Sequence, residues 1–481
     1  MKVLEALEPK AVFRFFEEIC SIPHGSGNTE QISHYLVTFA GDRNLECHQD
    51  KLGNVIIIKE ATAGYEKAPA VLVQGHMDMV AVKEPDADID MEKDGLRLHA
   101  EGDYIFAKGT SLGGDDGIAI AYALAVLDSD SIPHPRLEVV ITVDEEVGMD
   151  GAAYVDLSCC KARTMLNLDS EEEGIFLAGC AGGARADFRK SYPTELSEGE
   201  SLNLRICGLQ GGHSGVEIHK ERGNANCLLI RTLRALREVT DFFVVSLSGG
   251  TADNVIPGEA CAEILYTGEK EAVAACLQKM EKDIKIELRD KDPDFSLMAE
   301  FGKIQAKKCM TGKEADGLIR FLHVLPNGVQ AMSGAMEGLV ETSLNFGTLC
   351  LDGGELKAGF SVRSSVESSK EALLLRLRDM AELAGVTMEV SGNYPGWAYR
   401  KDSPLRAKME GIFREMYGYK PQIQAIHAGL ECGLFAEKIP DLDCVSLGPD
   451  IADIHTTKER LSVSSTKRVY EFFLKVLEEM K

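Results

Sequence analysis

The chain has 481 residues, of which 44% are hydrophobic and 27% charged, the composition of a soluble globular protein long enough for two or three domains. Its formal net charge is −25, and so acidic a surface repels nucleic acid phosphates and anionic membranes, which excludes both as partners. The 13 cysteines show no repeated metal-binding spacing and no apolar run approaches the ~20 residues of a membrane helix, so a reducing cytoplasm is the expected location.

The first part of the chain alternates between helix-type and strand-type patterns. Apolar residues from Val12 to Ile19 repeat with the period of a helix, and a second, longer helix is expected from about Gly117 to Leu127. Continuous apolar runs predict strands at Val55–Ile58, Val71–Gln74, Leu137–Val143 and Arg163–Leu168. Strands this apolar, separated by helices, predict a sheet that is covered on both faces.

The pattern changes from about residue 188. The order strand, helix, strand, strand, helix begins at Leu202 and begins again at Phe295, a spacing of roughly 100 residues. After Pro395 the earlier pattern returns, with a helix near Leu405–Met416 and a strand at Asp443–Leu447. The sequence therefore predicts a discontinuous α/β domain at 1–187 and 394–481. An α+β domain of two similar strand–helix–strand–strand–helix halves is predicted to be inserted at 188–393.

Histidines and carboxylates follow the ends of four predicted strands or precede the long helix. In an open α/β sheet, ligands bind outside the carboxyl ends of the strands, so these side chains are expected to converge at one edge of the sheet. In chain order they are His76, Asp78, Asp115, Asp116, Asp144, Glu145, Glu146, Asp169 and His455. Taken singly, each short motif is more often a solvated turn than a site.

Such a group of carboxylates would repel one another unless cations neutralised them. Mixed histidine and carboxylate ligands suit Zn²⁺, Co²⁺ or Mn²⁺. The set is large enough for two metal ions that share a carboxylate and a water, and such pairs lie ~3.5–4 Å apart and generate hydroxide at neutral pH. The residues therefore predict a two-metal hydrolase.

Several motifs resemble a known family. GHMDMV, GGDDG, VDEEVGMDGA, LNLDSEE and GGHSG, together with the late His455, resemble the co-catalytic zinc peptidases that include carboxypeptidase G and aminoacylase. GNANCLL, IHAGLECGLF and SLGP resemble the aminoacyl-histidine (cytosol non-specific) dipeptidase branch, and the resemblance spans essentially the whole chain. Family members commonly show Asp-Asn or Asp-Asp-Lys where this chain has Asp115-Asp116-Gly117, a departure that keeps the bridging carboxylate.

The resemblance implies two metal ions, most commonly zinc, with cobalt or manganese as alternatives. One would be held by His76, Asp115 and Asp169. The other would be held by Asp115, Glu146 and His455, so that Asp115 bridges the two. The α/β domain would be the catalytic domain and the inserted domain a lid.

Three further residues are predicted to be catalytic. Glu145 would be the general base that takes a proton from the bridging water, and Asp78, two residues after His76, would fix the tautomer of that imidazole. The resemblance implies that His213, in GGHSG, reaches over the metals and stabilises the tetrahedral oxyanion. A histidine that only shapes a turn is the alternative.

Substrate contacts are expected at three more positions. Asn254 and Arg363 match lid residues of the family that grip the substrate's C-terminal carboxylate, although Arg363 could equally form a structural salt bridge. Glu431, or less so its neighbour His427, would hold a free substrate amine.

The sequence thus predicts a metal-dependent dipeptidase that cuts unblocked dipeptides, including those ending in histidine, through a metal-bridging hydroxide. The partner is a dipeptide substrate, and a homodimer is compatible with the sequence. The alternatives are an N-acyl-amino-acid deacylase or carboxypeptidase of the same family, against which Glu431 argues, and a non-catalytic metal-binding scaffold. Neither Glu145 nor His213 would be needed in such a scaffold.

Overall fold

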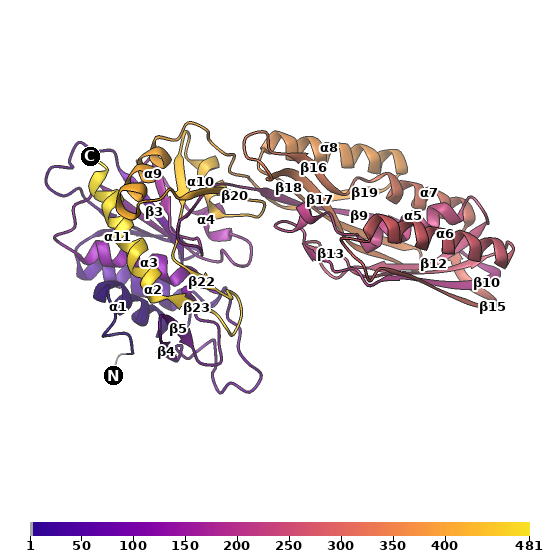
Figure 1. Cartoon of the computed structure of the whole chain (residues 1–481), viewed down its shortest axis with the longest axis horizontal. Coiled ribbons are helices and arrows are strands. Elements are labelled where there is room, and N and C mark those ends of the chain that lie inside the picture. Colours follow the sequence, from indigo (N-terminus) through magenta and orange to yellow (C-terminus); the bar gives the residue numbers. More distant parts are fainter. Residues whose placement is uncertain (1–2) are drawn as a thin grey trace. The chain divides into compact units, whose positions relative to one another are not determined.

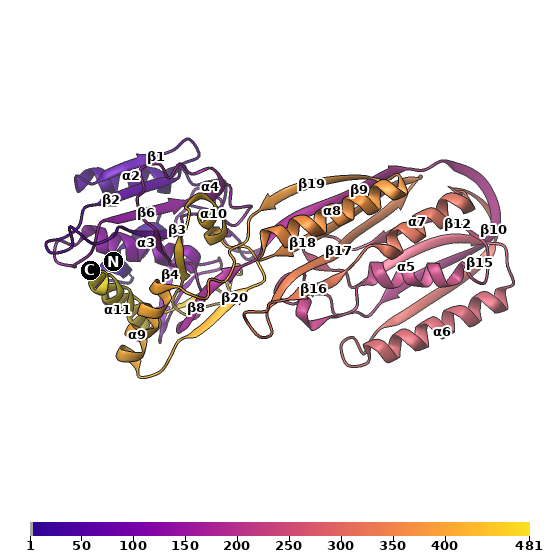
Figure 2. The same ribbon diagram turned by 90° about the horizontal axis from the view of Figure 1, so that it is seen from above.

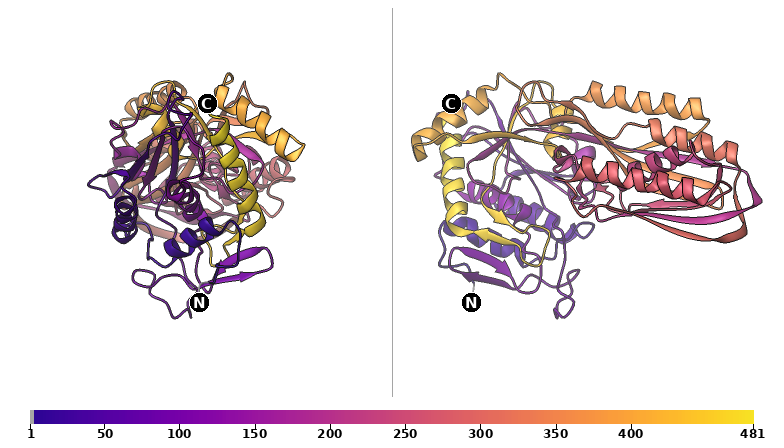
Figure 3. Two further views of the ribbon diagram at one scale, coloured as in Figure 1. Left: turned by 90° about the vertical axis from the view of Figure 1, so that its left-hand side faces the viewer. Right: turned by 45° about the vertical axis from the view of Figure 1, so that its right-hand side comes forward.

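The computed structural model describes residues 3–481, which form two compact units (Figure 1). The first unit contains the chain up to Gly179 together with Tyr399–Ala425 and Leu430–Lys481. The second contains Cys180–Ala398 and the short segment Ile426–Gly429. Both ends of the described chain belong to the first unit (Figure 3).

The first unit is built around an eight-stranded sheet. Its strands, in sheet order, are β1 (Glu46–Gln49), β2 (Val55–Lys59), β6 (Leu137–Thr142), β3 (Val71–His76), β7 (Thr164–Asn167), β21 (Asp443–Ser446), β8 (Ile175–Cys180) and β20 (Gln422–Ile426). Its helices are α1 (Lys10–Cys20), α2 (Glu30–Asp42), α3 (Gly114–Asp128), α4 (Asp150–Tyr154), α9 (Pro404–Tyr417), α10 (Glu431–Lys438) and α11 (Val463–Glu479). A separate four-stranded sheet contains β22 (Ile451–Ala452), β23 (Arg460–Ser462), β5 (Tyr104–Ala107) and β4 (Leu98–Glu101).

The four central strands of the large sheet run parallel and start level with one another. Val71, the first residue of β3, pairs with Leu137 of β6 and with Thr164 of β7, and Asp443 of β21 also pairs with Thr164. Parallel strands that start level also end close together, so the residues that follow them lie along one edge. This register therefore brings the candidate site residues that follow the strands to one edge of the sheet.

Both faces of the sheet are buried, as the apolar strands require. Val71 and Val73 pack into a core with residues of α1, α2, α3, α9 and α11, whereas Leu72 between them faces the opposite side. On that second face α10 packs against β21 and α4. Two of the helices begin at serine caps, since Ser403 and Ser462 accept hydrogen bonds from backbone N–H groups in the first turns of α9 and α11.

The second unit is a nine-stranded sheet with helices on one face (Figure 2). Its strands are β9 (Gly182–Ser191), β10 (Thr194–Cys207), β12 (Phe242–Gly249), β14 (Ala260–Tyr266), β15 (Ser296–Met310), β16 (Gly328–Met332), β17 (Val340–Asp352), β18 (Glu355–Ser364) and β19 (Thr387–Tyr394). The helices are α5 (Ala225–Leu236), α6 (Lys270–Leu288), α7 (Gly312–Val324) and α8 (Glu367–Ala384), with a single 3₁₀ turn η1 (Ile218–Lys220). A two-stranded ribbon joins β11 (Gly212–His213) to β13 (Val255–Ile256).

The main elements of the second unit follow the order strand, helix, strand, strand, helix twice. The first set is β10, α5, β12, β14 and α6, and the second is β15, α7, β17, β18 and α8. The boundaries expected from the sequence, 187/188 and 393/394, fall inside β9 and β19. Both strands lie wholly in the second unit, because β9 pairs with β18 on one side and with β19 on the other. Within residues 3–481, none of the helices is both long and apolar enough to cross a lipid bilayer.

Candidate active site

The carboxyl ends of the parallel strands bring the predicted metal ligands of the first unit together. His76 is the last residue of β3, Glu145 and Glu146 follow β6, and Asp169 follows β7. Asp115 is at the start of α3, in the part of that segment that lacks helical torsions. Grouped by their ligand atoms, Asp115, Glu146 and His455 lie close enough to hold one cation.

Asp115 faces two sets of ligands, one with each carboxylate oxygen. Its Oδ1 lies 3.2 Å from His76 Nε2, which is itself 3.7 Å from Asp169 Oδ1. Its Oδ2 lies 3.2 Å from His455 Nε2, which is 2.8 Å from Glu146 Oε1. Donor atoms bound about 2 Å from one tetrahedral cation lie roughly 3.3 Å apart, so the spacing between Asp115 and each of the two histidines is compatible with a divalent cation on either side of Asp115.

The electrostatics of this cluster favour positive charge. Hydrogen bonds to Asp115 and Glu146 raise the pKa of His455 to about 10. Burial lowers the pKa of His76, but hydrogen bonds to Asp115, Asp169 and Asp78 outweigh burial and raise it well above its usual value. Both imidazoles would thus be protonated, because the surrounding carboxylates stabilise positive charge.

Glu145 lies beside the ligands in an environment that disfavours its charge. Burial raises its pKa well above the usual value, and the carboxylates of Asp169, Glu431 and Glu146 add to the effect. One of its carboxylate oxygens lies within 4.8 Å of ligand atoms of both His76 and Glu146. A carboxyl group with a raised pKa next to a cation site suits a residue that must accept a proton and later release it.

Asp78 lies beside His76, and its backbone oxygen rather than its carboxylate is the nearer partner of the His76 ring. Nδ1 of His76 donates to the backbone oxygen of Asp78 at 3.0 Å, whereas the Asp78 carboxylate lies 3.5 Å away. That carboxylate accepts hydrogen bonds from Ser26 Oγ at 2.8 Å and from the backbone N–H groups of Glu145 and Glu146 at 3.0 and 3.3 Å. Asp78 therefore orients the His76 ring through its backbone and also braces the segment that carries Glu145.

The sequence alone did not assign a role to Asp116. Its carboxylate is 2% exposed and accepts the backbone N–H of His76 at 3.1 Å, and burial raises its pKa well above the usual value. It supports the strand end that presents His76, although one of its oxygens also lies near Asp169 and His76 ligand atoms. The adjacent Asp115, with one oxygen toward each histidine, is the better-placed bridging ligand.

Glu431 lies in a buried polar layer beneath the ligands. Its side chain is fully buried, and Oε2 accepts hydrogen bonds from Gln74 Nε2 at 2.5 Å and from Thr142 Oγ1 at 2.7 Å. Burial raises its pKa to about 7. Asn167 extends the layer by donating to Gln74 Oε1 at 2.6 Å. As placed, Glu431 contacts strand residues, and its assignment to a substrate amine stays a prediction.

In the second unit, the local backbone fixes the tautomer of His213. The N–H groups of Gly215 and Val216 both point to its Nδ1, each at 3.2 Å, so Nδ1 accepts and the ring proton is on Nε2. His213 is half-buried, and burial, followed by the charge of Arg363, lowers its pKa. The second unit therefore offers a neutral imidazole with a free N–H donor.

Asn254 lies next to His213, because the ribbon of β11 and β13 pairs His213 with Val255. The backbone N–H of Ser214 donates to the backbone oxygen of Asn254 at 2.9 Å, and the Asn254 side chain is exposed. Gly215 is required in this turn, since a Cβ atom there would lie 2.5 Å from the backbone oxygen of His427.

Arg363 is a buried guanidinium without an acidic partner. It is 8% exposed, Nη1 donates to Tyr394 Oη at 3.2 Å, and it forms no ion pair among residues 3–481. His427, a weaker candidate in the sequence analysis than Glu431, belongs to the same group. Its Nε2 lies 2.7 Å from Ser343 Oγ, and Ser343 pairs with Arg363 across β17 and β18. Burial, followed by the charge of Arg363, lowers the pKa of His427 to about 3. A buried cation among neutral histidines is suited to an anion.

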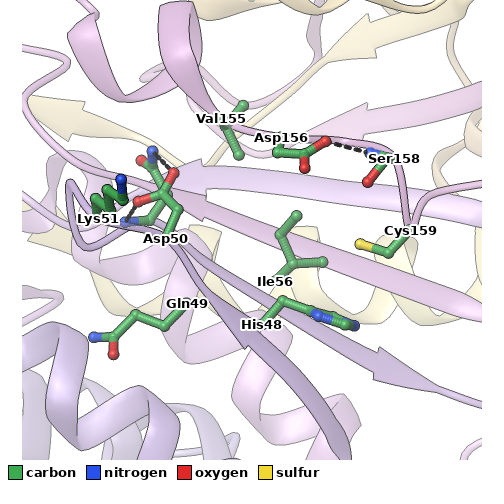
Figure 4. A pocket seen from close by; sticks show the side chains of 10 residues that line it. His48, Gln49, Asp50, Lys51, Ile56, Val155, Asp156, Ser158 and Cys159 are labelled. Carbon is green, nitrogen blue, oxygen red and sulfur yellow. Dashed lines mark hydrogen bonds between the residues drawn. The ribbon is translucent and has the colours of Figure 1, made fainter.

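A surface pocket of about 480 Å³ in the first unit lies outside this chemistry (Figure 4). Its lining includes His48 of β1, Asp50 in the turn after it, and Asp156 and Cys159 from the segment that follows α4. Asp50 accepts three backbone N–H groups of its own turn and Asp156 accepts that of Ser158, so these carboxylates shape local turns.

Comparisons with known proteins point to peptidases. A family model described as peptidase family M20/M25/M40 matches residues 72–479. The chain is 38% identical to the cytosol non-specific dipeptidase of Escherichia coli over 100% of its own length and 99% of that protein. The crystal structure of the aminoacylhistidine dipeptidase from Vibrio alginolyticus superposes with a TM-score of 0.92 at 37% identity, covering 99% of this chain and 97% of that one. An aminopeptidase from Bacillus cereus shares the fold at 16% identity, with a TM-score of 0.57 over 98% of this chain and 99% of that one.

Proposed function

Because the chain belongs to the peptidase family M20/M25/M40, and is a metallopeptidase, we propose that it is a two-metal dipeptidase acting on unblocked dipeptides, including those ending in histidine. The observation that carries the proposal is the two-sided contact of Asp115, with one oxygen toward His76 and the other toward His455. The names of the two relatives that match over nearly the whole chain support the dipeptide and histidine preferences.

His76, Asp115 and Asp169 would hold one divalent cation, and Asp115, Glu146 and His455 the other. When bound, the cations would polarise the scissile carbonyl and lower the pKa of a water molecule between them. Zinc is the proposed metal, with cobalt or manganese as alternatives, because imidazole and carboxylate ligands suit all three. The cysteines, none of which forms a disulfide within residues 3–481, and the cytosolic name of the relative support a cytoplasmic location.

Glu145 would remove the proton from the attacking water and deliver it to the leaving amine. Its raised pKa favours the proton-holding form between these two steps. Asp78 would keep Glu145 and Glu146 in place through their backbone N–H groups. His213 would donate from Nε2 to the oxyanion that forms on the carbonyl, and Nδ1 is already occupied as an acceptor, so the ring presents the required tautomer.

Arg363 would bind the C-terminal carboxylate of the dipeptide, with Asn254 beside His213 as a further polar contact. A guanidinium that is buried and lacks an acidic partner is the arrangement expected for a carboxylate ligand. The rival function is an N-acyl-amino-acid deacylase or carboxypeptidase of the same family. Because Glu431 is fully buried, its charge no longer argues against that rival, and substrate assays must separate the two.

The test is a substrate panel on metal-loaded and metal-stripped protein. Dipeptides, including Xaa-His, should be cut much faster than tripeptides and N-acetyl amino acids, and stripping with a chelator should abolish turnover until Zn²⁺, Co²⁺ or Mn²⁺ is returned. Full activity in protein shown to be metal-free would overturn the mechanism. A preference for N-acetyl amino acids would instead assign the rival function.

A further inference from the structure

The carboxylate of Glu459 accepts hydrogen bonds from four successive backbone N–H groups. Its Oε2 accepts from Leu112 at 2.8 Å and Gly113 at 3.2 Å, and its Oε1 accepts from Gly114 at 2.8 Å and Asp115 at 3.4 Å. The Glu459 side chain is buried, at 3% exposure. One buried acid therefore holds the whole segment that leads to the bridging ligand.

This segment needs an external acceptor because of its backbone shape. Gly113 adopts left-handed torsions, with φ at 67°, and Asp115 is non-helical, with φ −85° and ψ 105°. Successive N–H groups then point to one side and form a concave anion-binding nest. The first N–H groups of a helix also lack partners inside the helix. Without Glu459, buried donors would be left unsatisfied directly beside Asp115.

The same loop carries both Glu459 and the ligand His455. Glu459 follows His455 by four residues, and its backbone N–H donates to the oxygen of Thr456 at 3.2 Å, which closes the turn between them. His455 Nε2 lies 3.2 Å from Asp115 Oδ2. The loop thus touches Asp115 twice, at its backbone through Glu459 and at its carboxylate through His455.

We propose that Glu459 is a positioning residue for the cation site of Asp115, Glu146 and His455. It fixes the Asp115 backbone against the loop that supplies His455, so that Oδ2 faces this site before a cation arrives. The other site depends less on the loop, because His76 and Asp169 end or follow central strands held by the sheet. The inference rests on the proposed two-cation function.

The test is a Co²⁺ titration of the metal-free protein, followed by visible absorption, with the parent and Glu459→Gln. The amide nitrogen of Gln cannot accept hydrogen bonds, so two of the four backbone N–H groups would face a donor. We expect the second Co²⁺ to bind roughly 10- to 100-fold more weakly, the usual effect of losing a group that orients metal ligands, and the first to lose much less affinity although it shares Asp115.

Glu138→Gln is the matched control. Glu138 is also a fully buried carboxylate that accepts backbone N–H groups, those of Lys161 at 2.9 Å and Ala162 at 3.0 Å. It lies near the start of β6, whereas the metal ligands follow the end of that strand. This variant should lower the thermal stability of the metal-free protein and leave both Co²⁺ affinities at parental values.

A second variant, Glu459→Asp, keeps the charge but moves the acceptors back by one carbon–carbon bond. It should weaken the second Co²⁺ site more than the first, even if Glu459→Gln does not fold. Parental affinity at both sites in a folded Glu459 variant would overturn the inference, as would failure of both variants to fold, since Glu459 would then only support the fold. A parent protein that binds a single Co²⁺ would instead refute the two-cation function.

Discussion

The candidate-site histidines of the two units have opposite electrostatic environments. In the first unit, hydrogen bonds to carboxylates raise the pKa of His455 to about 10, and they raise that of His76 well above its usual value. In the second unit, burial and Arg363 lower the pKa of His427 to about 3 and also lower that of His213. The difference teaches that residue type alone does not assign a role. The first unit is arranged for cations, and the second is arranged for neutral donors and an anion.

The largest expected effect is on kcat, and it distinguishes the roles of the neighbouring acids Glu145 and Glu146 in the first unit. Glu145→Gln should lower kcat by roughly 100- to 10,000-fold, because the amide cannot accept the proton, while metal content stays at two ions per chain. Glu146→Gln should instead reduce the occupancy of one site. Turnover and metal analysis on both variants measures this, and identical losses of metal and rate would refute the division of labour.

The next effect concerns the second unit. His213→Ala should lower kcat by roughly 100- to 1,000-fold, the usual cost of one oxyanion donor, with unchanged metal content. The exposed His219, in the 3₁₀ turn η1 that follows β11, provides the control, and His219→Ala should retain parental turnover. If His213→Ala also lost metal, the separation between a cation-binding and an oxyanion-binding unit would fail.

A smaller effect is expected for the proposed carboxylate contact. Arg363→Ala should lower kcat/KM for a dipeptide by about 10- to 100-fold, the range for one hydrogen bond to a charged group. Amidation of the dipeptide's C-terminus should harm the parent far more than this variant. Arg189→Ala, which removes an exposed arginine of the same sheet, should behave as the parent. Equal sensitivity of parent and Arg363→Ala to amidation would place the carboxylate elsewhere.

The smallest effect is on stability as a function of pH. The folded chain keeps His427 neutral down to about pH 3, whereas the unfolded chain protonates it near pH 6.5, so the unfolded state binds the extra proton between these values. Stability from this group is complete above pH 6.5 and is lost as the pH falls. Between pH 7 and 5.5 the loss should be about 1 kcal/mol.

Urea unfolding of metal-free protein at the two pH values measures this loss, with His427→Asn as the comparison. The variant should lose less stability than the parent on acidification, because it lacks the titrating ring. An equal loss in both proteins would mean that His427 is not held neutral by its surroundings.

Much of the fold followed from local patterns. Continuous apolar runs predicted the central strands, and the periodic apolar residues from Val12 to Ile19 predicted a helix, which the structure shows as α1 at Lys10–Cys20. The parallel register was then enough to bring His76, Glu146 and Asp169 to one edge, because strand ends are a consequence of topology. The expected boundaries at 187/188 and 393/394 were less informative. The pairing of β9 with β18, and of β19 with β9, rather than composition, decides where these two strands belong.

Residue type, periodicity and order along the chain were sufficient to predict the fold class, the family and the metal-ligand candidates. The way in which those residues are supported depends on the tertiary structure. Glu459 reaches four N–H groups more than 340 residues earlier in the chain, and Glu431 is buried against Gln74 and Thr142. Such contacts join segments that are remote in sequence, and each depends on a specific distance and degree of burial. No local pattern records either quantity, so the packing of the folded chain alone could determine them.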